Sequence, residues 1–184
     1  MTDTTTKNET ATEFLRRQHS EVRSMFAQMS DLQGDARTGL FDCLRAFLAV
    51  HETAEEEIVH PAARKASAEG EKVVEARLAE EDEAKKVLSE LEKIGPGSTD
   101  FNEKFAQFKA AVEDHARAEE QELFPILEGN LDNDTLQAMA KKLQTAEKMA
   151  PTHPHPHAPE GAVGNMVLGP FVAMVDKVRD AIKG

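Results

Sequence analysis

The 184-residue sequence contains no tryptophan, no tyrosine and only one cysteine. A single cysteine excludes an internal disulfide, and it excludes zinc and iron–sulfur sites that are built from several thiolates. The absence of tyrosine removes the phenolate group as a metal ligand and the tyrosyl radical from any redox chemistry. Any metal ion bound by this chain would therefore be held by histidine and carboxylate side chains.

Long hydrophobic runs and basic clusters are also missing. No stretch approaches the roughly 18 consecutive apolar residues of a membrane span, and the polar segment 1–12 lacks the apolar core of a signal peptide. We therefore expect a cytoplasmic protein that does not associate with membranes. The formal net charge of −12 also argues against a nucleic-acid partner, because phosphate binding requires clustered lysine and arginine.

Up to residue 150, apolar residues recur at steps of three and four, and no segment alternates with a period of two. Thr10 and Glu13 form a capping-box pattern before the first apolar stripe. Because the predicted connections are short, we expect an all-α, up-down four-helix bundle with an additional amphipathic helix. The predicted helices span residues 12–32, 37–69, 71–94, 100–130 and 133–149.

Histidine and proline alternate over residues 151–159, a composition typical of an extended, polyproline-like linker. A short amphipathic helix is predicted after it, at about residues 170–183. The sequence thus predicts three parts: a disordered N-terminal tail over 1–11, the helical bundle over 12–150, and the His–Pro linker with the C-terminal helix over 151–184.

Two of the predicted helices carry the same motif at a spacing of 64 residues. His51 and Glu55 in the second helix match His115 and Glu119 in the fourth, with a second glutamate directly after each. A proline stands ten residues after each histidine, and the apolar residues upstream also match. Because residues four apart share one helix face, and both pairs continue an apolar stripe, we expect them to point into the core.

Two further polar residues interrupt apolar stripes: His19 in the first predicted helix and Glu81 in the third. A buried carboxylate without a partner is costly, because the charged group loses its hydration. Cations held between the helices would offset that cost; the alternative is a metal-free network of buried hydrogen bonds. The candidate metal ligands on the helices are His19, His51, Glu55, Glu81, His115 and Glu119.

This pattern of one histidine and two His-x-x-x-Glu motifs resembles the bacterial hemerythrin-like proteins, the HHE cation-binding domain family, over about residues 12–130. The resemblance implies a four-helix bundle around a non-haem di-iron centre, oxo- or hydroxo-bridged, that meets dioxygen, nitric oxide or hydrogen peroxide. It also implies the roles of the ligands: Glu55 and Glu119 would bridge the irons, and His19, His51 and His115 would be terminal ligands.

The third predicted helix departs from the family, which usually has a histidine where this chain has Glu81. A carboxylate in place of an imidazole makes the site harder and more anionic, which favours ferric iron. We therefore expect peroxide or nitric oxide chemistry rather than stable carriage of dioxygen.

Four histidines lie outside the repeated motifs and the first helix. His155, held between two prolines, is the first candidate to supply the missing nitrogen, with His153 and His157 as the others; the alternative is an exposed linker that binds no specific metal. His60 lies off the apolar face of the second helix, so we expect it at a helix end or around the ligands.

The remaining glutamates near the motifs, Glu56, Glu57, Glu120 and Glu122, are expected on solvated faces. His51 and Glu52 begin like the HExxH motif of zinc proteases, but the second histidine is missing. A protease site would also leave the second copy of the motif unexplained.

The sequence thus predicts a hemerythrin-like non-haem di-iron protein that binds or reacts with dioxygen, nitric oxide or hydrogen peroxide. As an enzyme it would be catalase-like or peroxidase-like, detoxifying peroxide or nitric oxide. The alternatives are a sensing or iron-storing protein without turnover and a metal-free helical interaction module. Manganese or zinc in place of iron, and the oligomeric state, are left open by the sequence.

Overall fold

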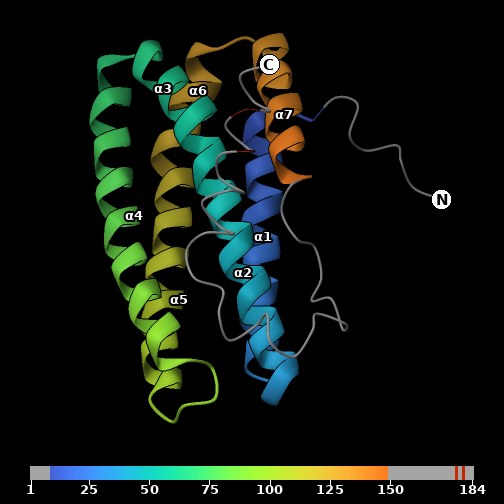
Figure 1. Ribbon diagram of the computed structural model, residues 1–184. Coiled ribbons are helices and arrows are strands. Elements are labelled where there is room, and N and C mark those ends of the chain that lie inside the picture. Colours follow the sequence, from blue (N-terminus) through green and yellow to red (C-terminus); the bar gives the residue numbers. More distant parts are fainter. Residues whose placement is uncertain (1–8, 149–176, 178–179, 181–184) are drawn as a thin grey trace, which may run out of the picture.

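The computed structural model describes residues 9–148 together with Lys177 and Asp180 (Figure 1). All regular structure in this part of the chain is helical. Five helices are long: α1 (Ala11–Met29), α2 (Gly34–Ala54), α4 (Ala68–Ile94), α5 (Phe101–Ala118) and α7 (Asn133–Glu147). Short elements continue two of them: the π-helix η1 (Glu55–Val59) and α3 (His60–Ala66) follow α2, and the π-helix η2 (Glu119–Leu123) and α6 (Phe124–Asn130) follow α5.

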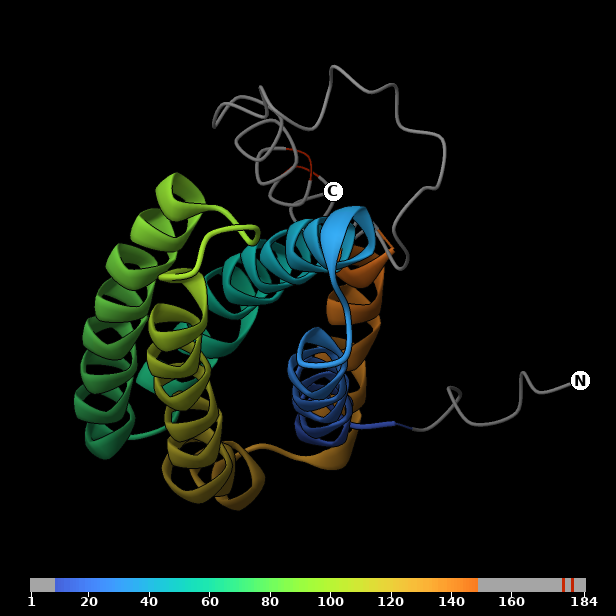
Figure 2. The same cartoon turned by 90° about the horizontal axis from the view of Figure 1, so that it is seen from below.

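The helices α1, α2, α4 and α5 run alternately up and down around one core (Figures 1 and 2). α4 packs along α5, and α1 packs against α2, while α7 lies against α1 and also contacts α2 and η1. This arrangement confirms the predicted all-α bundle with an additional amphipathic helix. No helix among the described residues is long and apolar enough to cross a membrane. The predicted His–Pro linker lies outside the described residues.

Side-chain caps explain where several helices begin. The hydroxyl of Thr10 accepts a hydrogen bond from the backbone N–H of Glu13, and the Glu13 carboxylate accepts one from the backbone N–H of Thr10, so the predicted capping box is present. Asp132 caps α7 in the simpler way, accepting from the N–H of Thr135 at 2.7 Å. These contacts satisfy N–H groups that have no partner inside the helix.

The break between the second and third predicted helices lies earlier than Gly70. The backbone is already extended at Ser67, whose hydroxyl accepts from the N–H of Gly70 and caps α4. Gly70 itself lies in the first turn of α4, against the backbone of α3. A Cβ at this position would lie 2.0 Å from the carbonyl oxygen of Ala63, so glycine is needed for the close approach of the two helices.

Two π-turns follow the two sequence motifs, and the sequence did not predict them. In each, a backbone N–H bonds to the carbonyl five residues earlier: His60 to Glu55, and Phe124 to Glu119. Pro61 then falls in the first turn of α3, where a proline needs no N–H partner. The chain thus passes Pro61 through a wider helical turn rather than a break, and this turn changes the face on which the following residues lie.

The core differs along the length of the bundle. Away from the π-turns, α1, α2 and α5 contribute a cluster of phenylalanines whose rings meet mainly edge to face, with centroids 5.1–6.5 Å apart. Towards the π-turns the buried side chains become polar. The cluster comprises Phe26, Phe41, Phe101, Phe105 and Phe108.

Candidate metal centre

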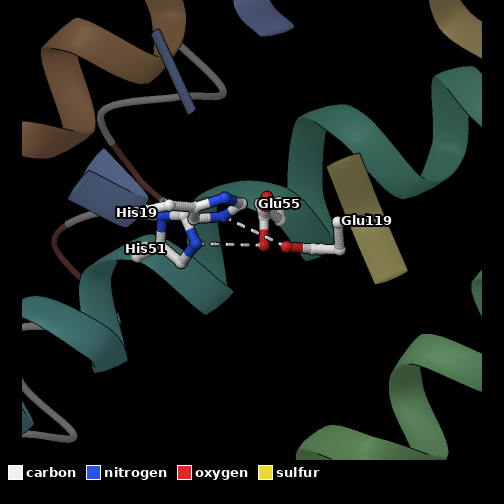
Figure 3. Close-up of side chains that lie close together, drawn as sticks. All are labelled: His19, His51, Glu55 and Glu119. Carbon is white, nitrogen blue, oxygen red and sulfur yellow. Dashed lines mark ion pairs between the residues drawn. The ribbon is translucent and has the colours of Figure 1, made fainter. Parts of the chain in front are cut away.

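Four buried side chains converge where α1, α2 and the two π-helices meet (Figure 3). α1 supplies His19, α2 supplies His51, and η1 and η2 supply their first residues, Glu55 and Glu119. One potential ligand atom of each residue lies within 4.8 Å of those of the other three. None of the four residues is more than 4% exposed. The four side chains are therefore close enough together to be candidate ligands of one cation.

A second group of donors adjoins the first. It consists of Glu52 from α2, Glu81 from α4 and His115 from α5, whose potential ligand atoms also lie within 4.8 Å of one another. Glu119 faces both groups: its Oε2 is 3.2 Å from Nε2 of His19, and its Oε1 is 3.5 Å from Nε2 of His115. One oxygen towards each group is the arrangement expected of a carboxylate shared by two cations.

The three histidine rings are oriented by hydrogen bonds on their outer nitrogens. Each Nδ1 lies within hydrogen-bond distance of a side-chain oxygen, and an Nδ1–H that donates to this oxygen would leave the lone pair of Nε2 facing the centre. Metal-binding histidines are commonly held in this way. The acceptors are Glu120 for His19 and Gln18 for His51, both at 2.8 Å, and Glu80 for His115 at 3.0 Å.

Many inward atoms of the two groups lack any hydrogen-bond partner among the described residues. Buried polar atoms are normally paired, and unpaired ones cluster where an ion or water belongs. Lone-pair donors that face one another satisfy a cation but cannot satisfy each other. These residues therefore fit a metal site. The unpaired atoms are Nε2 of His19 and of His115, both oxygens of Glu55 and of Glu119, Oε2 of Glu52 and Oε1 of Glu81.

The pKa values show what this packing does to the protein groups on their own. Burial, followed by the charge of Glu119, raises the pKa of Glu55 well above its ordinary value, and burial with the charge of Glu81 does the same for Glu52. Burial lowers the pKa of His51 to about 3, which keeps this ring neutral. Burial also opposes ionisation of Glu119, but the nearby imidazoles outweigh it and lower its pKa to about 2. A bound cation would favour ionisation of all the carboxylates.

The structure brings together all six helix residues that the sequence selected as candidate ligands. Four of them lie in the first group: His19, His51, Glu55 and Glu119. Glu81 and His115 lie in the second group, so the helical phase that favoured Glu81 over its neighbours matches its 2% exposure. His155, the seventh candidate, lies outside the described residues.

Glu52 is the member of the second group that the sequence argument missed. Successive residues on a helix are turned by about 100°, so a residue next to His51 was not expected on the same face. The two groups lie side by side across the bundle, however, and Glu52 faces the second group while His51 faces the first. The sequence feature that could have identified Glu52 as a candidate ligand is its position directly after His51 in the motif.

The expectation that the neighbouring glutamates are all solvated is wrong for Glu120. Its side chain is only 25% exposed and binds both His19 and Arg23. Glu122 is exposed as expected and pairs with Arg77 at 3.1 Å. The difference follows from η2, whose wider turn sets which side of the helix each residue occupies.

A cavity of about 280 Å³ lies between α2, α4 and α5 and reaches the second group. Its polar wall includes Lys85, whose ammonium is 3.3 Å from Oε2 of Glu81 and 3.3 Å from Oε1 of Glu56. The rest of the wall is largely apolar and includes Leu48, Leu88, Phe108 and Val112. The cavity gives a small molecule access to the second group.

A helical bundle whose core holds two adjoining groups of histidine and carboxylate donors defines a metal-binding helical protein. Residues 10–127 match the sequence model of the family described as the hemerythrin HHE cation binding domain. Because the match covers well over half of the chain, the protein belongs to the hemerythrin HHE cation-binding family.

Three individual proteins are similar to this chain. The chain is 30% identical over 137 residues to an uncharacterized hemerythrin-like protein of Schizosaccharomyces pombe, covering 74% of this chain and 68% of that protein. It is 26% identical over 134 residues to a DNA nickase of Nostoc, covering 72% of this chain but 38% of that protein. A crystal structure of a hemerythrin HHE cation binding domain-containing protein from Mycobacterium kansasii shares the fold, with a TM-score of 0.69, 22% identity, and coverage of 77% and 87% of the two chains.

Proposed function

We propose that this protein binds two iron ions in the two adjoining donor groups and reacts there with dioxygen, nitric oxide or hydrogen peroxide, with peroxide as the preferred substrate. The observation that carries the proposal is the set of buried, unpaired donor atoms on both sides of Glu119. A metal-free hydrogen-bond network would leave fewer of these atoms without partners.

The proposed ligands divide between the two groups. His19, His51 and Glu55 hold one ion, and Glu52, Glu81 and His115 hold the other. Glu119 is proposed as the carboxylate common to both, because it directs one oxygen towards each group. Three imidazoles and four carboxylates form a hard, anionic donor set, which favours iron in its ferric state over softer metals.

When bound, the iron pair supplies open coordination positions and a change of oxidation state. The protein supplies the surroundings. Hydrogen bonds from Nδ1 fix the histidine rings, and the apolar cavity wall limits the entry of water beside Glu81. Lys85, with its side chain 50% exposed, places a positive charge 3.3 Å from Oε2 of Glu81 at the solvent side of the cavity.

Metal analysis of protein expressed with added iron tests the proposal. We expect two iron ions per chain and release of dioxygen when hydrogen peroxide is added to the loaded protein. Two irons with stable nitric oxide or dioxygen adducts but no turnover would favour a sensing or storage role instead. An intact helical protein that binds no metal would refute the proposed function.

A further inference from the structure

His60 is a buried histidine that the ligand set proposed above does not use. It is the first residue of α3 and is only 3% exposed, although the sequence placed it off the core face of its helix. The reason is η1: the backbone N–H of His60 bonds to the carbonyl of Glu55, five residues earlier. In a π-turn, residues five apart lie close to one face, so His60 follows Glu55 towards the centre.

Neither ring nitrogen of His60 has a hydrogen-bond partner among the described residues. Its Nε2 lies 3.9 Å from Oε1 of Glu81, which is itself unpaired. A metal ion holds nitrogen and oxygen ligands at about 2.0–2.2 Å, so two donors on one ion are at most about 4.2 Å apart. The separation of His60 and Glu81 is within this limit.

The sequence repeat shows what this position does in the other half of the bundle. The residue equivalent to His60 is Phe124, also directly after a π-turn and before a proline. Phe124 is fully buried and stacks on the ring of His19, with centroids 5.8 Å apart. The position therefore faces the centre in both halves, and in one half an apolar ring fills it. A histidine at this position differs from phenylalanine by its ring nitrogens, which indicates that one of these nitrogens binds a partner such as a metal ion.

The two donor groups differ in nitrogen content. The first contains two histidines, whereas the second contains His115 alone, because Glu81 stands on α4 where an imidazole was expected. We propose that His60 is the second nitrogen ligand of the ion held by Glu52, Glu81 and His115. The structure thus offers a donor within the bundle, and a tail histidine such as His155 is not needed. This inference rests on the proposed two-metal centre.

Cobalt(II) loading tests the proposal, because its visible spectrum reports the ligands of each ion without any need for turnover. The variant His60→Phe copies the other half of the repeat and should fold; His60→Gln serves as a smaller change should the phenylalanine not fit. We expect both variants to keep their circular dichroism, to bind the second cobalt at least tenfold more weakly, and to show an altered ligand-field band. His155→Ala tests the competing ligand from the tail, and under the present proposal its spectrum should match that of the unmodified protein.

A measurement on the unmodified protein adds an independent readout. In zinc-loaded protein with ¹⁵N-labelled histidine, Nε2 of His60, assigned by its loss in His60→Gln, should resonate among the metal-bound nitrogens. Two tightly bound ions and an unchanged spectrum in His60→Phe would overturn the proposal, as would an altered spectrum in His155→Ala alone. Failure of the unmodified protein to bind two ions would instead refute the two-metal centre.

Discussion

Glu119 is the residue at which the two halves of the centre meet. It is fully buried, and its two oxygens approach His19 on one side and His115 on the other. Three imidazoles surround it and lower its pKa to about 2 against the effect of burial. Among the carboxylates of the two donor groups, Glu119 is therefore the one whose pKa is lowered, whereas the pKa values of Glu52, Glu55 and Glu81 are raised.

This position makes Glu119→Gln a direct test of the shared ligand. The amide keeps the shape of the side chain but removes the negative charge and one good ligand atom. We expect metal content to fall from two ions per chain to below one, measured by elemental analysis, with helicity retained. Glu83→Gln, at a side chain that is 73% exposed, is the control and should leave two ions bound. Loss of only one ion in Glu119→Gln would show that Glu119 belongs to a single site.

At the scale of elements, the π-turns separate what the sequence could predict from what it could not. A regular helical period correctly placed His51 and Glu55 on one face, because the helix is α-helical up to that point. Beyond Glu55 the same period is less reliable. It placed His60 off the apolar face, at a helix end or around the ligands, and the structure shows it buried beside Glu81. It placed Glu120 in solvent, whereas Glu120 binds the candidate ligand His19. A single wider turn shifts every later residue, and no local sequence preference identifies it. In the sequence, the positions of the two π-turns are indicated only by Pro61 and Pro125, which follow them at equivalent positions of the repeat.

The joint between α3 and α4 depends on Gly70, where an added Cβ would meet a backbone oxygen at 2.0 Å. Gly70→Ala should therefore lower the free energy of unfolding by about 1–3 kcal/mol or more, because backbone atoms cannot move aside as a flexible side chain can. Urea unfolding followed by circular dichroism measures the effect. Gly97→Ala, where a Cβ has nothing within 4 Å, is the matched control. Equal stability of the two variants would contradict the close helix approach.

At the scale of the whole molecule, composition and periodicity were enough for the fold class, the number of long helices and the six converging ligand candidates. The missing information concerned distances across the bundle. Glu52 contributes because the two donor groups lie side by side, and this depends on how α2, α4 and α5 are placed around each other. Sequence periodicity describes one helix at a time, so it cannot predict how the helices are placed around each other.

The convergence of four carboxylates from α2, η1, α4 and η2 also gives the bundle a pH dependence. Burial raises the pKa values of Glu52, Glu55 and Glu81, and repulsion from neighbouring carboxylates adds to this effect at Glu52 and Glu55, so these groups hold protons more tightly than free glutamate does. A cation needs them ionised, and binding must therefore release protons. His51, with its pKa lowered to about 3, is neutral throughout this range and releases none.

We accordingly expect the affinity for cobalt(II) to increase as pH rises from the ordinary glutamate pKa through the raised values of these carboxylates. Calorimetric titration in two buffers with different ionisation enthalpies measures the number of protons released. An affinity that does not change with pH, with no proton release, would show that the carboxylates are already ionised in the metal-free protein.

Along the length of the bundle, the core is divided into an apolar end and an end with polar, charged side chains. The phenylalanine cluster is stabilised by burial of apolar surface, which does not depend on any ligand. The other end gathers buried carboxylates whose ionisation is disfavoured by burial and repulsion, and a bound cation would stabilise their ionised forms. Removing the metal should therefore loosen one end of the bundle while the other stays folded, so that amide hydrogens near the π-turns exchange with solvent long before those beside the phenylalanines. In this way the supply of metal sets the local stability of one half of the protein.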